Sequence, residues 1–201
     1  MQEQHYLIPT QEEGQEKDIT HSILTKTIAD AEDWFVDAKE RLLDVNNWKK
    51  FSGIADASFK LTDSHGRAVN RRARKGDHIR IDIPEQGVDM DGGFYWAVIE
   101  AIEYDDYPDE DAETFAIRVR PSSNPMRRDD ISDIFGNVAT STFVIGRAGK
   151  ILNSGYHGRN EQGDLELVSI TGYTSTASLV TSAWLGLSDA QCAELVIGFM
   201  E

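Results

Sequence analysis

The stretch DAEDWFVDAKERLLDVNNWKKF, residues 30–51, holds the one long amphipathic helix pattern of this sequence. Apolar side chains recur every three or four residues and fall within an arc of about 100° on a helical wheel. They are Ala31, Trp34, Phe35, Ala38, Leu42 and Val45. Asp30 suits the N-cap, and Asn46 and Asn47 suit a stop. We therefore expect a long helix near the N-terminus with Trp34 at the centre of its buried face.

A helix with two aromatic residues on its buried stripe needs a broad apolar surface, and a curved β-sheet can supply one. Alternating apolar residues predict strands after the helix. The expected strands are residues 57–62, 78–83, 94–104 and 114–120, and a hairpin over 140–158 that turns at Ala148 and Gly149. Within 94–104, the alternation places Trp96, Val98 and Ile102 on one face and Tyr95, Ala97, Ile99 and Ala101 on the other.

The two ends of the chain have different characters. Residues 1–19 are rich in Gln and Glu and are expected to form a loose arm, followed by a short strand over 21–28. Residues 188–191 form a capping-box pattern that opens a C-terminal helix through Met200. The fold prediction is a single α+β domain over residues 20–201. A curved antiparallel β-sheet packs against one long N-terminal helix plus a C-terminal helix.

This order of elements resembles the helix-grip fold of START-like (SRPBCC) domains, in which a curved sheet wraps a long helix and encloses a pocket. The segment DVNNWKKF, residues 44–51, is similar to that family's acidic and aromatic signature. The sequence departs from the family because its long helix lies near the N-terminus instead of last. The resemblance implies a ligand-binding pocket between sheet and helix.

Composition limits the partners. The 201 residues carry a formal net charge of −15, which repels phosphate backbones and anionic lipid. We therefore expect no nucleic acid and no membrane partner. Cys192 is the only cysteine, so no intrachain disulfide can form. No signal-peptide pattern and no apolar run of transmembrane length is visible, which favours a cytoplasmic protein. The sequence leaves the oligomeric state open.

Aromatic residues are the candidate lining of a sheet–helix pocket, because such side chains commonly line ligand sites. The candidates are Trp34, Trp48, Phe59, Trp96 and Phe143. The favoured function is therefore non-enzymatic binding of a small apolar or amphipathic ligand, or of a protein partner, in this pocket. A related alternative is an inhibitor or adaptor module that meets a basic partner through its acidic surface.

An enzymatic alternative rests on the end of the predicted hairpin. There His157 could act as a base, Arg159 could bind an anion and Glu161 could orient the imidazole. This would make the protein a hydrolase or lyase. Glu100 is a further candidate, since a carboxylate on a half-buried strand face has its pKa raised by desolvation. No cofactor motif and no metal-binding motif is present, and we expect neither group.

The basic run between Arg67 and Lys75 is the one cationic feature of the sequence. Its members are Arg67, Arg71, Arg72, Arg74 and Lys75. They could bind an anionic ligand or nucleic acid, but no aromatic residue is interleaved with them. We expect a surface loop whose cations pair with the protein's own acidic residues.

Overall fold

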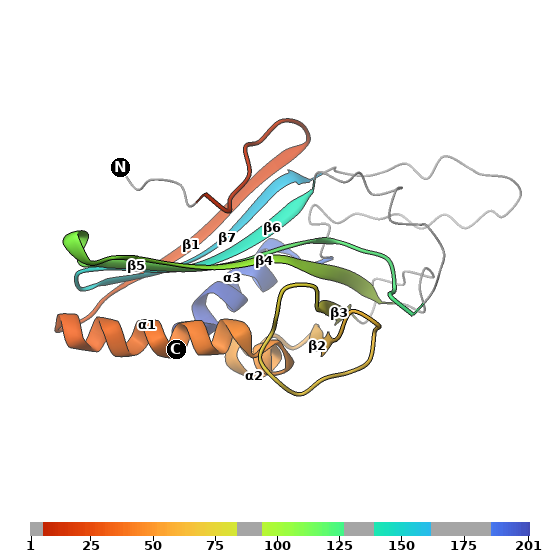
Figure 1. The fold of residues 1–201 in the computed structure, drawn as a ribbon, viewed down its shortest axis with the longest axis horizontal. Coiled ribbons are helices and arrows are strands. Elements are labelled where there is room, and N and C mark those ends of the chain that lie inside the picture. Colours follow the sequence, from red (N-terminus) through yellow and green to blue (C-terminus); the bar gives the residue numbers. More distant parts are fainter. Residues whose placement is uncertain (1–5, 84–93, 127–138, 162–185) are drawn as a thin grey trace, which may run out of the picture.

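In the part of the chain that the structure describes, seven antiparallel strands form one curved sheet, and three α-helices cover one of its faces (Figure 1). The computed structural model describes residues 6–83, 94–126, 139–161 and 186–201. The strands are β1 (Gln15–Leu24), β2 (Ser58–Thr62), β3 (His78–Asp82), β4 (Tyr95–Tyr107), β5 (Ala112–Pro121), β6 (Thr140–Ala148) and β7 (Ile151–Glu161). Their order in the sheet is β1-β7-β6-β5-β4-β3-β2. The α+β prediction and its curved antiparallel sheet are confirmed.

The long helix α1 (Ile28–Leu43) begins earlier than predicted. Its N-cap is Thr27, whose hydroxyl oxygen accepts from the Asp30 amide at 3.0 Å, while the Asp30 carboxylate accepts from the Thr27 amide at 3.0 Å. This reciprocal capping box places Asp30 in the first turn instead of at the cap. The predicted stop is confirmed, because a 3₁₀ turn η1 (Val45–Asn47) separates α1 from the short α2 (Trp48–Ser52).

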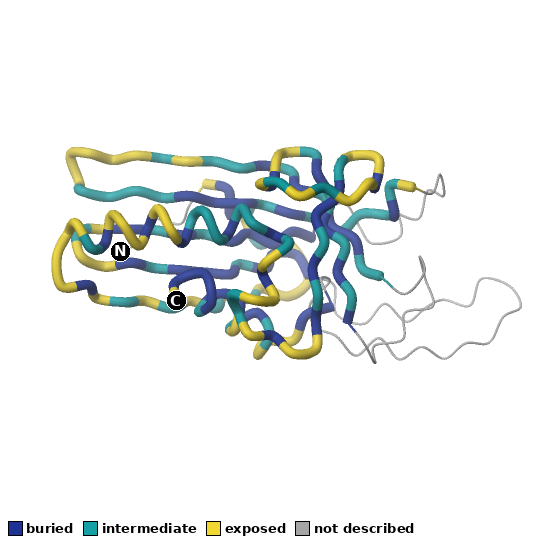
Figure 2. The backbone as a smooth tube through the Cα atoms, turned by 90° about the horizontal axis from the view of Figure 1, so that it is seen from below, coloured by how far each residue is buried: buried dark blue, intermediate teal, exposed yellow. Residues whose placement is uncertain are grey.

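Trp34 is not at the centre of the buried face. Trp34 is 43% exposed, whereas Phe35 and Leu42 are fully buried. Trp34 lies at the margin of the apolar arc, about 60° from Ala31 on a wheel of 100° per residue. It also belongs to the N-terminal half of α1, which carries most of the exposed residues of this helix (Figure 2).

The N-terminal segment is ordered over most of the predicted arm. Strand β1 starts at Gln15 and pairs with β7 at the edge of the sheet, so residues 15–19 are not a loose arm. Its polar residues alternate because every second side chain points to solvent. Leu7 is also buried, at 5% exposure. Residues 1–5 lie outside the described residues.

A β-bulge at Glu100 changes the predicted faces of β4. The register passes from Ile99–Val119 to Ala101–Arg118, which leaves Glu100 as the extra residue. Beyond the bulge the alternation is reversed. Ile102 therefore packs with Ile99 against the main core, and Ala101 lies on the face of Trp96.

We call the helix-covered side of the sheet its inner face and the opposite side its outer face. The inner face carries the main core, in which α2 and α3 (Asp189–Gly198) pack on strands β1, β2 and β7. The outer face carries a small cluster in which Leu7 contacts Ala101, Ala116 and Val144. No helix among the described residues is long and apolar enough to cross a membrane.

Candidate functional site

Three of the five predicted pocket aromatics come together, but they form packed core. The Trp48 ring lies 5.3 Å from Phe59, 5.2 Å from Phe143 and 5.5 Å from Phe199, centroid to centroid. Trp48 and Phe143 are 1% exposed. Two cavities lined by described residues, presented below, contain none of these rings in their lining. Trp34 is partly exposed, and Trp96 lies on the outer face opposite Arg80.

The predicted trio on β7 is divided between the two faces. Arg159 and Asn160 together stand opposite Glu16 of β1, because the register shifts between the pairs Gln15–Glu161 and Lys17–Gly158. Asn160 adopts the left-handed conformation (φ 55°), which asparagine tolerates better than most residues. This irregularity turns Glu161 to the inner face. His157 and Arg159 share the outer face, as the alternation along a strand requires.

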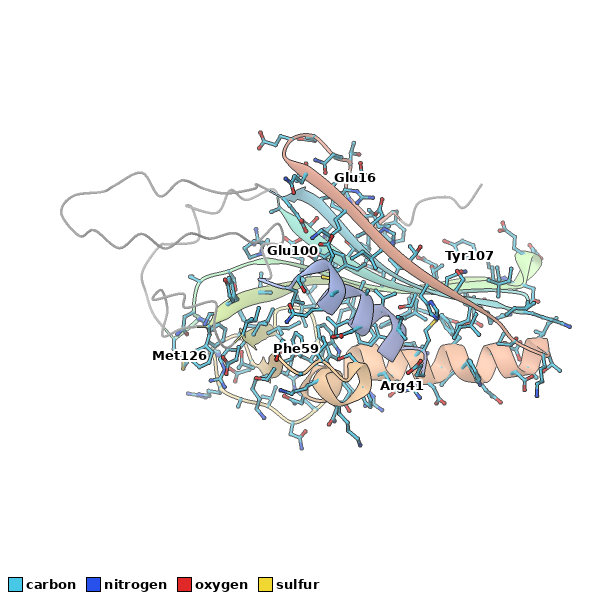
Figure 3. All side chains as sticks on the ribbon, turned by 180° about the vertical axis from the view of Figure 1, so that it is seen from behind. Glu16, Arg41, Phe59, Glu100, Tyr107 and Met126 are labelled. Atoms are coloured by element: carbon cyan, nitrogen blue, oxygen red, sulfur yellow. The ribbon has the colours of Figure 1, made fainter. Side chains whose placement is uncertain are left out.

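An outer-face cleft of about 380 Å³ surrounds His157 and Arg159. Its lining comes from four adjacent strands and from the N-terminal segment: Ile8, Glu16, Asp18, Thr20, Ser22, Thr114, Val144, Gly146, Asn153, Ser154, Gly155, His157 and Arg159. Glu16, labelled in Figure 3, lies at the N-terminal end of β1 and belongs to this lining. Gly146 leaves the sheet surface open, because no side chain rises from it, whereas the His157 ring lies over Gly155.

Asp18 is the residue that organises this cleft. Its carboxylate lies 2.6 Å from His157 Nδ1 and 2.9 Å from Arg159 Nη1. Arg159 also pairs with Glu16 at 3.2 Å and donates to the Gly158 carbonyl at 2.8 Å. The Arg159 side chain is only 3% exposed. Its guanidinium is therefore occupied within the protein, which argues against the predicted role in anion binding.

Burial and pairing set the charges in the cleft. Burial lowers the pKa of His157, and the neighbouring Asp18 carboxylate offsets only part of that effect. Burial would raise the pKa of Asp18, but hydrogen bonds from Arg159 and His157 outweigh it and lower this pKa. Near pH 7 a charged Asp18 therefore faces a neutral imidazole. The His157 ring lies along the strand, with Nε2 2.7 Å from the place where a Cβ on residue 155 would stand.

Glu161 belongs to a separate polar cluster inside the core. Tyr156 donates to Glu161 Oε1 at 2.9 Å and lies 2.8 Å from Ser141 Oγ. Burial raises the pKa of Glu161, while the hydrogen bond from Tyr156 and the charge of Lys17 offset part of that rise. Lys17 forms an ion pair with Asp189 of α3 at 2.6 Å. The sheet thus separates Glu161 from the cleft, so Glu161 cannot orient His157.

Glu100 and part of the basic run have partners within the protein. Glu100 accepts from Arg118 at 3.1 Å and pairs with Arg120 at 3.0 Å, and its side chain is 23% exposed. Arg71 forms a two-point ion pair with the buried carboxylate of Asp77. Arg72 pairs with Glu40 of α1. For Arg71 and Arg72, the predicted pairing with the protein's own acidic residues is confirmed.

Sequence reasoning missed Glu16, Asp18 and the two glycines of the cleft. The alternation of Glu16, Asp18, Thr20 and Ser22 was an available signal for a strand with a polar outer face. The predicted arm, residues 1–19, covers the first half of this alternation because the surrounding residues are rich in Gln and Glu. Among the described residues, no group of three or more histidine, cysteine or acidic side chains is arranged to hold a metal ion.

No protein-family model matches this chain, and neither does any curated protein sequence. The chain is similar in structure to norcoclaurine synthase from Thalictrum flavum, with a TM-score of 0.36, 10% identity, and coverage of 78% of this chain and 83% of that one. It is also similar to major latex-like protein 151 from Panax ginseng, with a TM-score of 0.33, 11% identity, and coverage of 73% and 80%. Likenesses of this size support no argument about function.

Proposed function

We propose that this protein binds a small amphipathic ligand, without transforming it, in the cleft between β1 and β7 on the outer face of the sheet. The observation that carries the proposal is the 380 Å³ cleft itself, whose size falls in the range of ligand sites, about 300–1,000 Å³. The order of one strand, a helical region, six strands and a C-terminal helix agrees with the helix-grip resemblance. That resemblance implies a pocket on the helix-covered face, so the proposal for the outer face rests on the cleft itself.

The lining indicates the chemistry of the ligand. Ile8 and Val144 offer apolar contact on one part of the cleft, while Thr20, Ser22 and Asn153 offer hydrogen-bonding groups on another. The carboxylates of Glu16 and Asp18 lie at the rim, with side chains 51% and 45% exposed. An anionic ligand would be repelled there, because Arg159 is buried and already paired, and the His157 imidazole is neutral. The proposal is therefore a neutral or cationic ligand with an apolar part.

A glycine substitution can test the site with little cost to the fold. At Gly146 an added Cβ would meet nothing closer than 3.8 Å, so Gly146→Val fills the cleft from its floor. Ala148→Val is the matched control, because it adds bulk to the same face of β6, two residues along, outside the cleft. The experiment is a thermal-shift screen with neutral and cationic amphipathic metabolites.

The expected result is a set of compounds that stabilise the wild type and Ala148→Val but not Gly146→Val. Stabilisation should follow RT ln(1 + [L]/Kd) as concentration rises. Compounds that stabilise Gly146→Val as strongly as the wild type would place the ligand outside this cleft, against this proposal. A screen without any stabilising compound would also contradict it and would favour a protein partner.

Acid–base catalysis is a second candidate, favoured by the 2.6 Å contact between His157 Nδ1 and Asp18. A neutral imidazole that donates from Nδ1 to a carboxylate presents Nε2 as a base. In this reading Asp18, not Glu161, orients the ring. A panel of ester substrates tests it. Turnover that falls by a factor of about 10² to 10⁴ in His157→Ala would support a hydrolase, whereas binding that survives this change without turnover supports the binder.

A further inference from the structure

A second cavity, of about 260 Å³, lies on the outer face where β3, β4 and β5 are adjacent. It is lined by Ser64, His78, Val98, Arg120, Pro121, Ser122, Ser123 and Pro125. None of these residues lines the β1–β7 cleft. Val98 stands between its cross-strand partners His78 and Arg120, so these two side chains flank one position of β4. The cavity is therefore a separate site from the one proposed above.

Besides Arg120 Nε, which has an ion pair with Glu100, two buried polar atoms at this cavity have no hydrogen-bond partner among the described residues. They are His78 Nδ1 and Ser122 Oγ. A buried donor or acceptor left unsatisfied costs about 1–3 kcal/mol, so native proteins seldom retain one without a reason. Both atoms belong to residues of the cavity lining. A bound group that accepts hydrogen bonds would satisfy the Ser122 hydroxyl, whereas the neutral His78 ring donates to the Asp63 backbone and presents Nδ1 as an acceptor.

The lining of the cavity contains one permanently charged cation, Arg120, and no acidic residue from the part of the chain that the structure describes. Arg118 and Arg120 share the single carboxylate of Glu100, which leaves this group of three with one net positive charge. Arg120 pairs through Nε, and its side chain is 40% exposed at the cavity. Asp63 and Asp77 act on His78 by charge, but neither lines the cavity.

We infer that this cavity binds a phosphate-type oxyanion, held by the Arg120 guanidinium and by a hydrogen bond from the Ser122 hydroxyl. Guanidinium groups match the geometry of such oxyanions, and hydroxyl groups supply further donors. Ser64 and Ser123 add two more hydroxyl groups to the lining. A volume of 260 Å³ also leaves room for a small organic group attached to the phosphate.

Two substitutions of matched chemistry test this inference. Arg120→Gln removes a cation that lines the cavity, while Arg118→Gln removes the other cation on the same Glu100 carboxylate, outside the lining. Ser122→Ala removes one donor and no charge. Each variant is first compared with the wild type by circular dichroism. Binding of inorganic phosphate and of phenyl phosphate is then measured by calorimetry, with chloride as the control at constant ionic strength.

We expect the wild type to bind phosphate in preference to chloride, Arg120→Gln to bind at least about tenfold more weakly, and Ser122→Ala to bind severalfold more weakly. Arg118→Gln should stay within about threefold of the wild type. Tighter binding of phenyl phosphate would identify an organic phosphate as the ligand, and equal binding would identify the free anion. The inference is overturned if wild type shows no preference for phosphate, or if Arg118→Gln loses as much affinity as Arg120→Gln.

Discussion

The two faces of one sheet differ in how completely they are filled. On the inner face, Trp48, Phe143, Tyr156 and Phe199 contact one another in a chain of tilted and edge-on rings, each 1% exposed or less. On the outer face, the same strands present glycines, hydroxyls and ion pairs around two cavities. The difference indicates that stability resides on the inner face, and that ligands should be sought on the outer face.

The largest expected effect comes from the inner face. Trp48→Ala should lower the free energy of unfolding by about 3–5 kcal/mol, because the indole fills a closed site and donates to the Leu42 carbonyl at 3.1 Å. Trp34→Ala is the matched control and should cost less than about 1 kcal/mol, since Trp34 is partly exposed. Urea denaturation of both variants measures the difference. Equal losses would mean that the buried Trp48 of α2 and the partly exposed Trp34 of α1 do not differ in packing as described.

An intermediate effect is expected where the outer face is closed by the N-terminal segment. The Asn160 side chain accepts from the Glu12 and Glu13 amides at 2.7 and 3.1 Å, and its backbone is left-handed. Asn160→Ala loses both features and should cost about 1–3 kcal/mol. Asn160→Gly keeps the backbone freedom and should cost less. Faster hydrogen exchange at Glu12 and Glu13 in both variants would locate the loss, and unchanged exchange would contradict it.

A smaller effect, which depends on pH, should come from the polar cluster of the inner face. Burial raises the pKa of Glu161 above its ordinary value of 4.5. The stability that the protonated carboxyl contributes is therefore fully present below pH 4.5. It is lost as the pH rises through the folded-state value. Glu161→Gln mimics the protonated group and should therefore gain stability relative to wild type between about pH 4.5 and pH 8.

Urea denaturation at several pH values tests this trend. Glu194→Gln, on the exposed side of α3, is the control for the loss of one carboxylate at the surface. A Glu161→Gln variant that loses stability relative to wild type as the pH rises would show that the carboxylate is better solvated than the inner face allows.

The smallest expected effect concerns the reactivity of the Cys192 thiol, which we expect to be very low in the native protein. Burial raises the pKa of the Cys192 thiol to about 12, and the residue is fully buried among the inner-face side chains. The native protein should therefore react with a disulfide reagent far more slowly than the unfolded chain, which exposes its one thiol. Fast reaction under native conditions would indicate that the inner face opens, and it would revive a ligand site between sheet and helices.

The sequence predicted the fold where a pattern was regular and long. The apolar arc of residues 30–45 and the alternation along β3, β5 and β6 identified α1 and most of the sheet. The errors fall at single irregular residues. The bulge at Glu100 and the left-handed Asn160 each reverse an alternation, and neither leaves a mark in hydrophobicity. Thr27 was missed because Asp30 is an equally good cap by residue type.

The candidate site was predicted only in part. The pair His157 and Arg159 was visible because both residues lie on one short, polar end of a predicted strand. Their partner Asp18 lies 139 residues earlier in the chain than His157. Nothing in residue spacing relates two strands so distant, because their pairing depends on how the whole sheet closes. Predicted site residues far from one another in sequence therefore needed the structure.

The pairing of β1 with β7 also affects how the protein folds during synthesis. Strand β1 leaves the ribosome long before β7 is synthesised, so this edge strand stays unpaired until most of the chain has emerged. Folds dominated by such distant pairings form slowly and leave unpaired strand edges exposed meanwhile. Glu16, Lys17 and Asp18 place charges along this waiting strand, and charged edge residues discourage pairing with other chains. The residues that later hold His157 and Arg159 can thus also protect the nascent chain from aggregation.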